Sequence, residues 1–235
     1  MSHFIRLLPV LALLAPGCAG SVKVDEIESF GLVTSAIWIH LETDDFESHS
    51  IVLSNQSGLC TSLESYYSAY QEFEDAVEEA SENIDDFCEE MEEPYADYAD
   101  ASSTVNSDGA RYLNIAVNND GESEPEEEEY EVGDDPGFGG GITYYTGDLL
   151  SDQLEDFDPD GDAADNCGVD PEDFDAEDYY EAWFFDDGDL AISSVSDEDS
   201  VKGEFTVDLV TADEDEDDAG TATGKFSATY CHIEL

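Results

Sequence analysis

Short segments of alternating apolar and polar residues recur along the chain. This period of two is typical of β-strands with one buried face. The alternating segments are residues 30–41, 50–54, 111–117, 142–145, 180–185, 190–195, 201–210 and 221–233. The step Asp187–Gly188 between two of them is a strong signal for a tight hairpin turn. The last two segments predict a hairpin whose tip is a run of acidic residues.

One longer segment has a helical period instead. Within residues 61–98, apolar side chains recur every three or four positions, which is the spacing of one helix face. Thr61 and Glu64 form a capping box at its start. Pro94 predicts that the helix ends or kinks near Glu93. The opposite face is almost entirely acidic, so packing of the apolar stripe has to outweigh the repulsion between like charges.

These patterns together predict a mainly β fold. We expect an antiparallel β-sandwich-like domain of seven to nine strands, with one long inserted amphipathic α-helix after the second strand. Residues 30–235 would form a single acidic domain, with acidic loops at about 119–141, 152–178 and 211–220. The glycines within 137–141 are interpreted as a flexible hinge.

The spacing of the cysteines constrains their pairing. Cys60 and Cys88 flank the predicted helix and would lie about 42 Å apart along a straight helix. A disulfide requires Cα atoms within about 7 Å, so Cys60–Cys88 is the least favoured pair. We favour Cys60–Cys231 with Cys88–Cys167, and the combination Cys60–Cys167 with Cys88–Cys231 stays open. Disulfides of this kind form in oxidising compartments.

The first seventeen residues have the layout of a secretory signal peptide. Arg6 gives a cationic start, residues 7–14 are mostly apolar, and small residues precede Cys18. The apolar run is too short to span a bilayer, which needs roughly 20 residues. We therefore predict a signal peptide over residues 1–17.

The sequence Ala-Pro-Gly-Cys at residues 15–18 resembles the lipobox of bacterial lipoproteins, although Leu14 lies one place earlier than in the usual pattern. The resemblance implies that Cys18 carries a lipid with several acyl chains, such as palmitate, which hold a protein firmly at a membrane. Ala19 in place of Asp implies sorting to the outer membrane. Lipidation of Cys18 also leaves an even number of cysteines for disulfides. Ordinary secretion is the alternative.

The charge of the chain is extreme. It has 63 acidic residues against five Lys and Arg, for a formal net charge of −58, and every acidic residue follows Cys18. Such a charge excludes unaided binding to nucleic acids and to anionic membranes. Salt shortens the range of the repulsion to about 8 Å at physiological strength and about 3 Å at 1 M. We interpret the composition as adaptation to salty surroundings, with cation binding and solubility as alternatives. Residues 18–29 are expected to form the lipidated Cys and a flexible tether that holds the domain away from the membrane.

One acidic segment resembles the start of an EF-hand loop. Spaced aspartates followed by a glycine are how hard cations such as Ca²⁺ are collected. The candidate calcium ligands are Asp156, Asp158, Asp160, Asp162 and Asp165. Cys167 stands where a bidentate Glu belongs, so a plain acidic loop is the alternative interpretation. Ca²⁺ is the one cofactor that the sequence suggests.

Motifs for catalysis are not recognisable in the sequence. There is no G-x-S-x-G elbow, P-loop or dinucleotide fingerprint. His40, Glu42 and His49 could offer a metal set, but without an H-E-x-x-H motif we interpret His40, His49 and His232 as ordinary strand and turn residues. His40 and His232 are expected on neighbouring strands. We name no catalytic residue.

The sequence therefore predicts a lipid-anchored structural or binding protein of the cell envelope, at the outer membrane. Its partners would be the membrane, through the lipid on Cys18, and a cell-surface protein or polysaccharide, but not nucleic acid. A calcium-dependent adhesion module is the first alternative. A surface hydrolase with two carboxylates in a cleft is the second.

Overall fold

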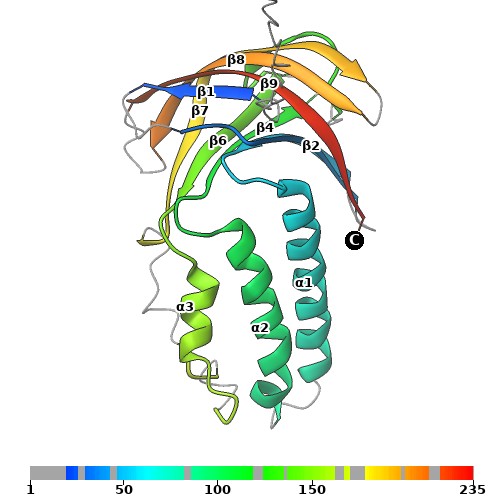
Figure 1. Cartoon of the computed structure of the whole chain (residues 1–235), viewed down its shortest axis with the longest axis vertical. Coiled ribbons are helices and arrows are strands. Elements are labelled where there is room, and N and C mark those ends of the chain that lie inside the picture. The colour runs from blue at the N-terminus through cyan, green and yellow to red at the C-terminus, as the bar shows by residue number, and fades with distance from the viewer. Residues whose placement is uncertain are drawn as a thin grey trace, which may run out of the picture.

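The computed structural model describes residues 20–25, 30–42, 47–81, 86–118, 124–134, 137–161, 167–169, 178–196, 199–211 and 218–234. In these residues the fold is mainly β, with one large mixed sheet and three helices. Figure 1 shows the sheet arching over the helices, which extend side by side from one side of it. The predicted lipidation site Cys18 lies outside the described residues, as do Asp162 and Asp165 of the predicted calcium loop.

The sheet has nine strands in the described part of the chain. They are β1 (Gly20–Val24), β2 (Ser35–Glu42), β3 (Glu47–Ser54), β4 (Arg111–Asn118), β5 (Glu129–Val132), β6 (Gly137–Tyr145), β7 (Tyr180–Ser196), β8 (Ser200–Thr211) and β9 (Asp218–Glu234). Their order is β1-β9-β2-β3-β4-β6-β5-β7-β8, and β8 also pairs with β9, so the sheet closes on itself.

The predicted antiparallel sandwich is right in part. Most strand pairs are antiparallel, but β2 runs parallel to β9 and β5 runs parallel to β6. The walls that face each other across the core belong to one continuous sheet and not to two separate sheets. The parallel pair arises because β9 returns to the start of the fold and lies beside β2.

The main hydrophobic core fills the interior of the closed sheet. The alternating residues Leu113, Ile115 and Val117 of β4 are buried there, together with Trp38 of β2 and Phe205 of β8. Burial of apolar area at roughly 25 cal/mol per Å² is the dominant stabilising contribution to such a core. A second, smaller core lies on the outer face of β2, β3 and β9, where the helices pack.

The single long helix of the prediction is a pair of helices. α1 (Leu59–Ala80) and α2 (Phe87–Val105) pack against each other, and α3 (Leu149–Asp156) packs against α2. The spacing of apolar residues by three and four positions continues from α1 into α2, because the apolar faces of both helices lie at the interface between them. Pro94 lies inside α2 instead of ending it. Its cost of about 3 kcal/mol has to be offset by packing.

Aromatic rings fill the space between α1 and α2. Phe73 of α1 stacks on Tyr98 of α2 with ring centroids 5.2 Å apart, and the hydroxyls of Tyr66 and Tyr98 lie 3.1 Å apart. Burial raises the pKa of Tyr98, and the hydrogen bond with Tyr66 adds to this effect. Among the described residues, no helix combines the length and the apolar character that crossing a membrane requires.

Two segments that were predicted as a turn and a hinge lie inside strands. β7 runs as one strand through the expected Asp187–Gly188 hairpin, with a bulge between Phe185 and Asp187. The predicted hinge of glycines belongs to β6, where a Cβ at Gly140 would lie 2.0 Å from the carbonyl oxygen of Asn114. Glycine is needed there because neighbouring strands approach closely. The predicted acidic loop 119–141 therefore contains β5 and the first half of β6.

The predicted tether is also partly a strand. Gly20–Val24 form β1, which pairs antiparallel with β9 along its whole length. Val22 and Val24 pack against the main core, whereas Ser21 and Lys23 are exposed. The prediction of a flexible tether is wrong for these five residues. They form a strand because they pair with β9, which lies at the far end of the chain. One residue, Ala19, separates the strand from Cys18.

Both disulfides tie the helices to other parts of the fold. Cys60 at the start of α1 is bonded to Cys231 in β9, with Cα atoms 5.9 Å apart. Cys88 at the start of α2 is bonded to Cys167, with Cα atoms 5.5 Å apart. These are the two pairs that the sequence favours. α1 and α2 run antiparallel, with Tyr66 beside Tyr98 and Phe73 beside Tyr95, so Cys88 lies at the far end of the helix pair from Cys60.

Candidate functional site

The three histidines that follow Cys18 lie in one row across three adjacent strands. The register pairs His40 of β2 with His49 of β3 on one side and with His232 of β9 on the other. The ring centroids are 4.3 and 4.8 Å apart, and the ring planes are inclined by only 16° and 10°. We call these residues the histidine row. The expectation that His40 and His232 lie on neighbouring strands is confirmed.

The histidine row lies at the border between the main core and solvent. His49 is buried, His40 is half-buried and His232 is exposed. The ring centroid of Trp38, two residues before His40 and deep in the core, lies 5.8 Å from that of His49. The row is thus on the core side of the sheet, close to the end of β9 that is marked C in Figure 1. One end of the row is held by packing, and the other is open to ions and water.

A tyrosine orients the central ring. The hydroxyl of Tyr230 lies 2.7 Å from Nδ1 of His40, at hydrogen-bond distance. When Nδ1 donates this hydrogen bond, the lone pair of the neutral ring is on Nε2. A partner of this kind fixes the direction of an imidazole ring.

Glutamates occupy the next positions along each of the three strands. The register pairs Glu42 with Glu47 and with Glu234. The sequence analysis recognised His40, Glu42 and His49 as a candidate metal set. It expected His232 beside His40, but it did not include His232 in that set.

No family model, curated protein or solved structure matches this chain. Its candidate sites are therefore interpreted from their own geometry.

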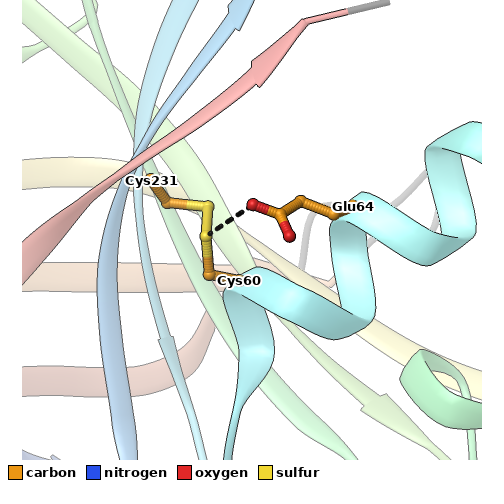
Figure 2. Close-up of side chains that lie close together, drawn as sticks. All are labelled: Cys60, Glu64 and Cys231. Atoms are coloured by element: carbon orange, nitrogen blue, oxygen red, sulfur yellow. Dashed lines mark hydrogen bonds between the residues drawn. A yellow bond between two sulfur atoms is a disulfide. The ribbon is translucent and has the colours of Figure 1, made fainter.

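The Cys60–Cys231 disulfide supports the histidine row from the opposite face of the sheet. Cys231 lies between Tyr230 and His232 in the sequence, so the bond to α1 restrains the segment of β9 that carries both. Figure 2 shows Glu64 of α1 beside this disulfide, with its Oε1 atom 3.7 Å from Cys60 Sγ. The ligand atoms of Cys60, Glu64 and Cys231 lie within 4.8 Å of one another. Metal binding by cysteine requires a thiolate, and the disulfide leaves none here.

The predicted calcium ligands are only partly described. Asp156 ends α3, and the side chain of Asp158 accepts a hydrogen bond from the backbone N–H of Asp160. In the described ranges these three aspartates do not form a cluster of converging ligand atoms. Asp162 and Asp165 lie outside those ranges. Calcium binding by this loop stays a prediction, and calorimetry with Ca²⁺ on the purified chain tests it.

A shallow cavity of about 460 Å³ lies on the outer surface of β1, β7, β8 and β9. Lys23 and Lys225 line it and form ion pairs with Asp25 and Glu204, respectively. Lys202 is also on β8 and is exposed. We call Lys23, Lys202 and Lys225 the lysine face. Sequence reasoning missed it, because the three lysines are brought together only by the pairing of β9 with both β1 and β8.

Buried carboxylates, which a hydrolase of the predicted kind requires, are not found among the described residues. The polar side chains buried there are Ser35, His49, Ser54 and Ser102. A second cavity, of about 290 Å³, lies where α1 and α2 meet Phe157, Cys167 and Val169, and it is lined almost entirely by apolar and aromatic side chains. The described part of the structure therefore gives no support to the hydrolase alternative.

Proposed function

We propose that the protein is a lipid-anchored binding domain of the cell envelope, held through Cys18 with its lysine face towards the membrane. The observation that carries this proposal is the position of β1. It starts at Gly20 and is paired with β9 along its length. Two residues span at most about 7 Å, so a lipid on Cys18 would keep this corner of the sheet next to the bilayer.

The distribution of charge supports this orientation. Of the four Lys and Arg residues that follow Cys18, the three lysines are on β1, β8 and β9. Lysine close to an anionic membrane surface contributes at most about 1 kcal/mol of attraction, and the ion pairs of Lys23 with Asp25 and of Lys225 with Glu204 reduce this contribution. α1 and α2 contain acidic residues but no Lys or Arg, and Figure 1 shows them extending from the other side of the sheet. In this orientation the most acidic elements are farthest from the membrane.

Two further features agree with an extracytoplasmic location. Disulfides such as Cys60–Cys231 and Cys88–Cys167 persist in oxidising compartments. Anchoring by lipid also accounts for the fifth cysteine, which would otherwise remain a thiol in such a compartment. The surfaces that point away from the membrane are then available to a cell-surface protein or a polysaccharide.

The mass of the native N-terminus tests the proposal. We expect residues 1–17 to be absent and Cys18 to carry a diacylglycerol and a further acyl chain. The matched control is Cys18→Ser, which should leave the membrane fraction and appear in the soluble fraction, with both disulfides unchanged. An N-terminus that starts elsewhere, or an unmodified Cys18, would contradict the anchor.

The orientation has a separate test. Lys23 and Lys225 should react more slowly with a water-soluble amine reagent in membranes than in the Cys18→Ser chain. Equal rates in the two preparations would reject the orientation while leaving the anchor intact.

A further inference from the structure

We propose that the cavity between α1, α2 and the end of α3 binds a small organic cation of the quaternary ammonium class. The proposal names a ligand for the binding domain but does not depend on its lipid anchor. It rests on the size and lining of the cavity, on three aromatic rings that meet at its wall, and on surroundings that contain acidic but no basic residues.

The cavity has the size and the lining of a site for a compact apolar molecule. Its volume is about 290 Å³, and an apolar protein cavity of about 150 Å³ already holds a benzene ring. There is therefore room for a ring that carries a small substituent. We call it the aromatic cavity. Its lining residues are Phe73, Val77, Phe87, Met91, Tyr95, Phe157, Cys167 and Val169.

Tyr95 lies between two other rings in the wall of the aromatic cavity. Its ring centroid is 5.9 Å from that of Phe73 in α1 and 5.3 Å from that of Phe157 after α3. The ring planes are inclined by 39° and 54°, so the three rings meet at angles and do not stack in a column. An aromatic face attracts a cation within about 6 Å, and groups of rings bind quaternary ammonium ions in this way.

The wall is held in place without a ligand. The hydroxyl of Tyr95 donates a hydrogen bond to Oε1 of Gln153 in α3, at 3.2 Å. The disulfide between Cys88 and Cys167 joins α2 to the segment that contributes Cys167 to the lining. A site that is fixed by such links loses little conformational entropy when a ligand binds.

The charge around the aromatic cavity favours a cation. The sequence has no Lys or Arg in residues 24–110 or 112–201, so every segment that lines the cavity, and every segment that adjoins it in sequence, lacks basic residues. A cation is attracted by the nearby carboxylates, and an anion of the same shape is repelled. Exposed acidic residues directly precede or follow lining residues at Glu74, Glu78, Glu90, Glu92, Asp156 and Asp158.

The apolar lining selects among cations. A primary ammonium ion has three N–H donors, and burying them without partners is costly. A quaternary ammonium ion has no N–H group, and its charge is spread over methyl groups that pack against aromatic and aliphatic side chains. The aromatic cavity is therefore better suited to a quaternary ammonium ion than to a protonated amine.

Titration calorimetry with phenyltrimethylammonium at physiological salt tests the proposal. The Cys18→Ser chain, with both disulfides intact, keeps every described residue and needs no detergent, which would compete for an apolar cavity. We expect one site per chain with a dissociation constant on the order of 0.1–1 mM. Benzenesulfonate has an aromatic ring of the same size but the opposite charge, and we expect it not to bind.

Two substitutions separate attraction to the rings from burial in an apolar cavity. Phe73→Leu and Phe157→Leu each remove a ring and keep an apolar side chain. Each should weaken binding of phenyltrimethylammonium by about fivefold or more, but that of its uncharged isostere tert-butylbenzene by less than about twofold. Phe184→Leu replaces an exposed ring on β7 that does not line the cavity and should bind both probes like the parent chain. Circular dichroism checks the fold, and two independent sites keep the test valid if one variant does not fold.

Nuclear magnetic resonance provides a second readout. The N-methyl protons of the bound probe should show Overhauser contacts with the ring protons of Phe73, Tyr95 and Phe157. The proposal is overturned if the probe does not bind, if benzenesulfonate binds as tightly, or if the contacts lie elsewhere. Equal weakening of both probes by the leucine variants would also overturn it, because the cavity would then be apolar without preference for a cation. These outcomes are independent of the anchor, since the chain used lacks Cys18.

Discussion

The sheet and the pair α1 and α2 are stabilised in different ways. The sheet encloses the main core, and its central residues, such as Leu113 and Ile142, have no exposed surface. The helices meet through half-buried aromatic rings and carry acidic residues without basic ones. Each helix starts beside a cysteine that is bonded to another part of the fold. The disulfides therefore attach α1 and α2, which bury fewer apolar side chains than the sheet and carry acidic residues that repel one another.

Of the changes considered, loss of a disulfide should have the largest effect on the stability of the helices relative to the sheet. The Cys60–Cys231 and Cys88–Cys167 bonds join residues 171 and 79 positions apart, and bonds closing loops of this size contribute about 3 to 5 kcal/mol each. We expect the double variant Cys88→Ser/Cys167→Ser to lower the free energy of unfolding by that amount. Hydrogen exchange should show faster opening in α1 and α2 than in β4 and β8. Equal acceleration in sheet and helices would contradict the comparison.

A matched pair of leucine substitutions comes next. Leu113→Ala in the sheet removes a side chain with 0% exposure and should cost about 3 kcal/mol, because it leaves a cavity. Leu63→Ala in α1 removes a half-buried side chain at the smaller core and should cost about 1 kcal/mol. Denaturant unfolding of the two variants measures the difference. A cost for Leu63→Ala as large as that for Leu113→Ala would mean that the helices share the stability of the main core.

The smallest effect concerns charge. Glu89 and Glu93 of α2 are exposed and one turn apart, so Glu93→Gln should stabilise the fold by a few tenths of a kcal/mol. The gain should vanish at about 1 M salt, where repulsion is screened within about 3 Å. The native chain should also melt at a markedly higher temperature in molar salt than in dilute buffer. Equal melting temperatures would reject the interpretation of the composition as adaptation to salt.

Strands with one strongly buried face were the easiest part to predict from the sequence. β4, β8 and β9 alternate cleanly, and their predicted ends lie within a few residues of the observed ones. β1 and β5 were missed because they are short and gain their stability from partners that are distant in sequence. The division into α1 and α2 was missed because the helical spacing of apolar residues continues from one helix into the next. The hairpin predicted at Asp187–Gly188 was wrong, because the same residue types also occur beside a bulge in a long strand.

The candidate sites divide in a similar way. Helix geometry argued only against the pair Cys60–Cys88 and left two combinations of the four cysteines open, of which the favoured one is found in the structure. The sequence analysis expected His40 and His232 on neighbouring strands, but it did not predict that all three histidines lie in one register. Their assembly depends on the parallel pairing of β2 with β9, which joins the two ends of the domain. Long-range pairings of this kind are set by the closure of the whole sheet and not by neighbouring residues.

β9 pairs with β1, β2 and β8 and carries Cys231. During synthesis the earlier strands therefore emerge long before the strand that joins them. Folds dominated by such distant contacts form slowly, since the entropy of closing long loops must be overcome first. A chain truncated before β9 would lack the partner of β1, the closure of the sheet and one disulfide at the same time. The order of the strands thus makes folding nearly all-or-none, so an incomplete chain would stay open to proteolysis.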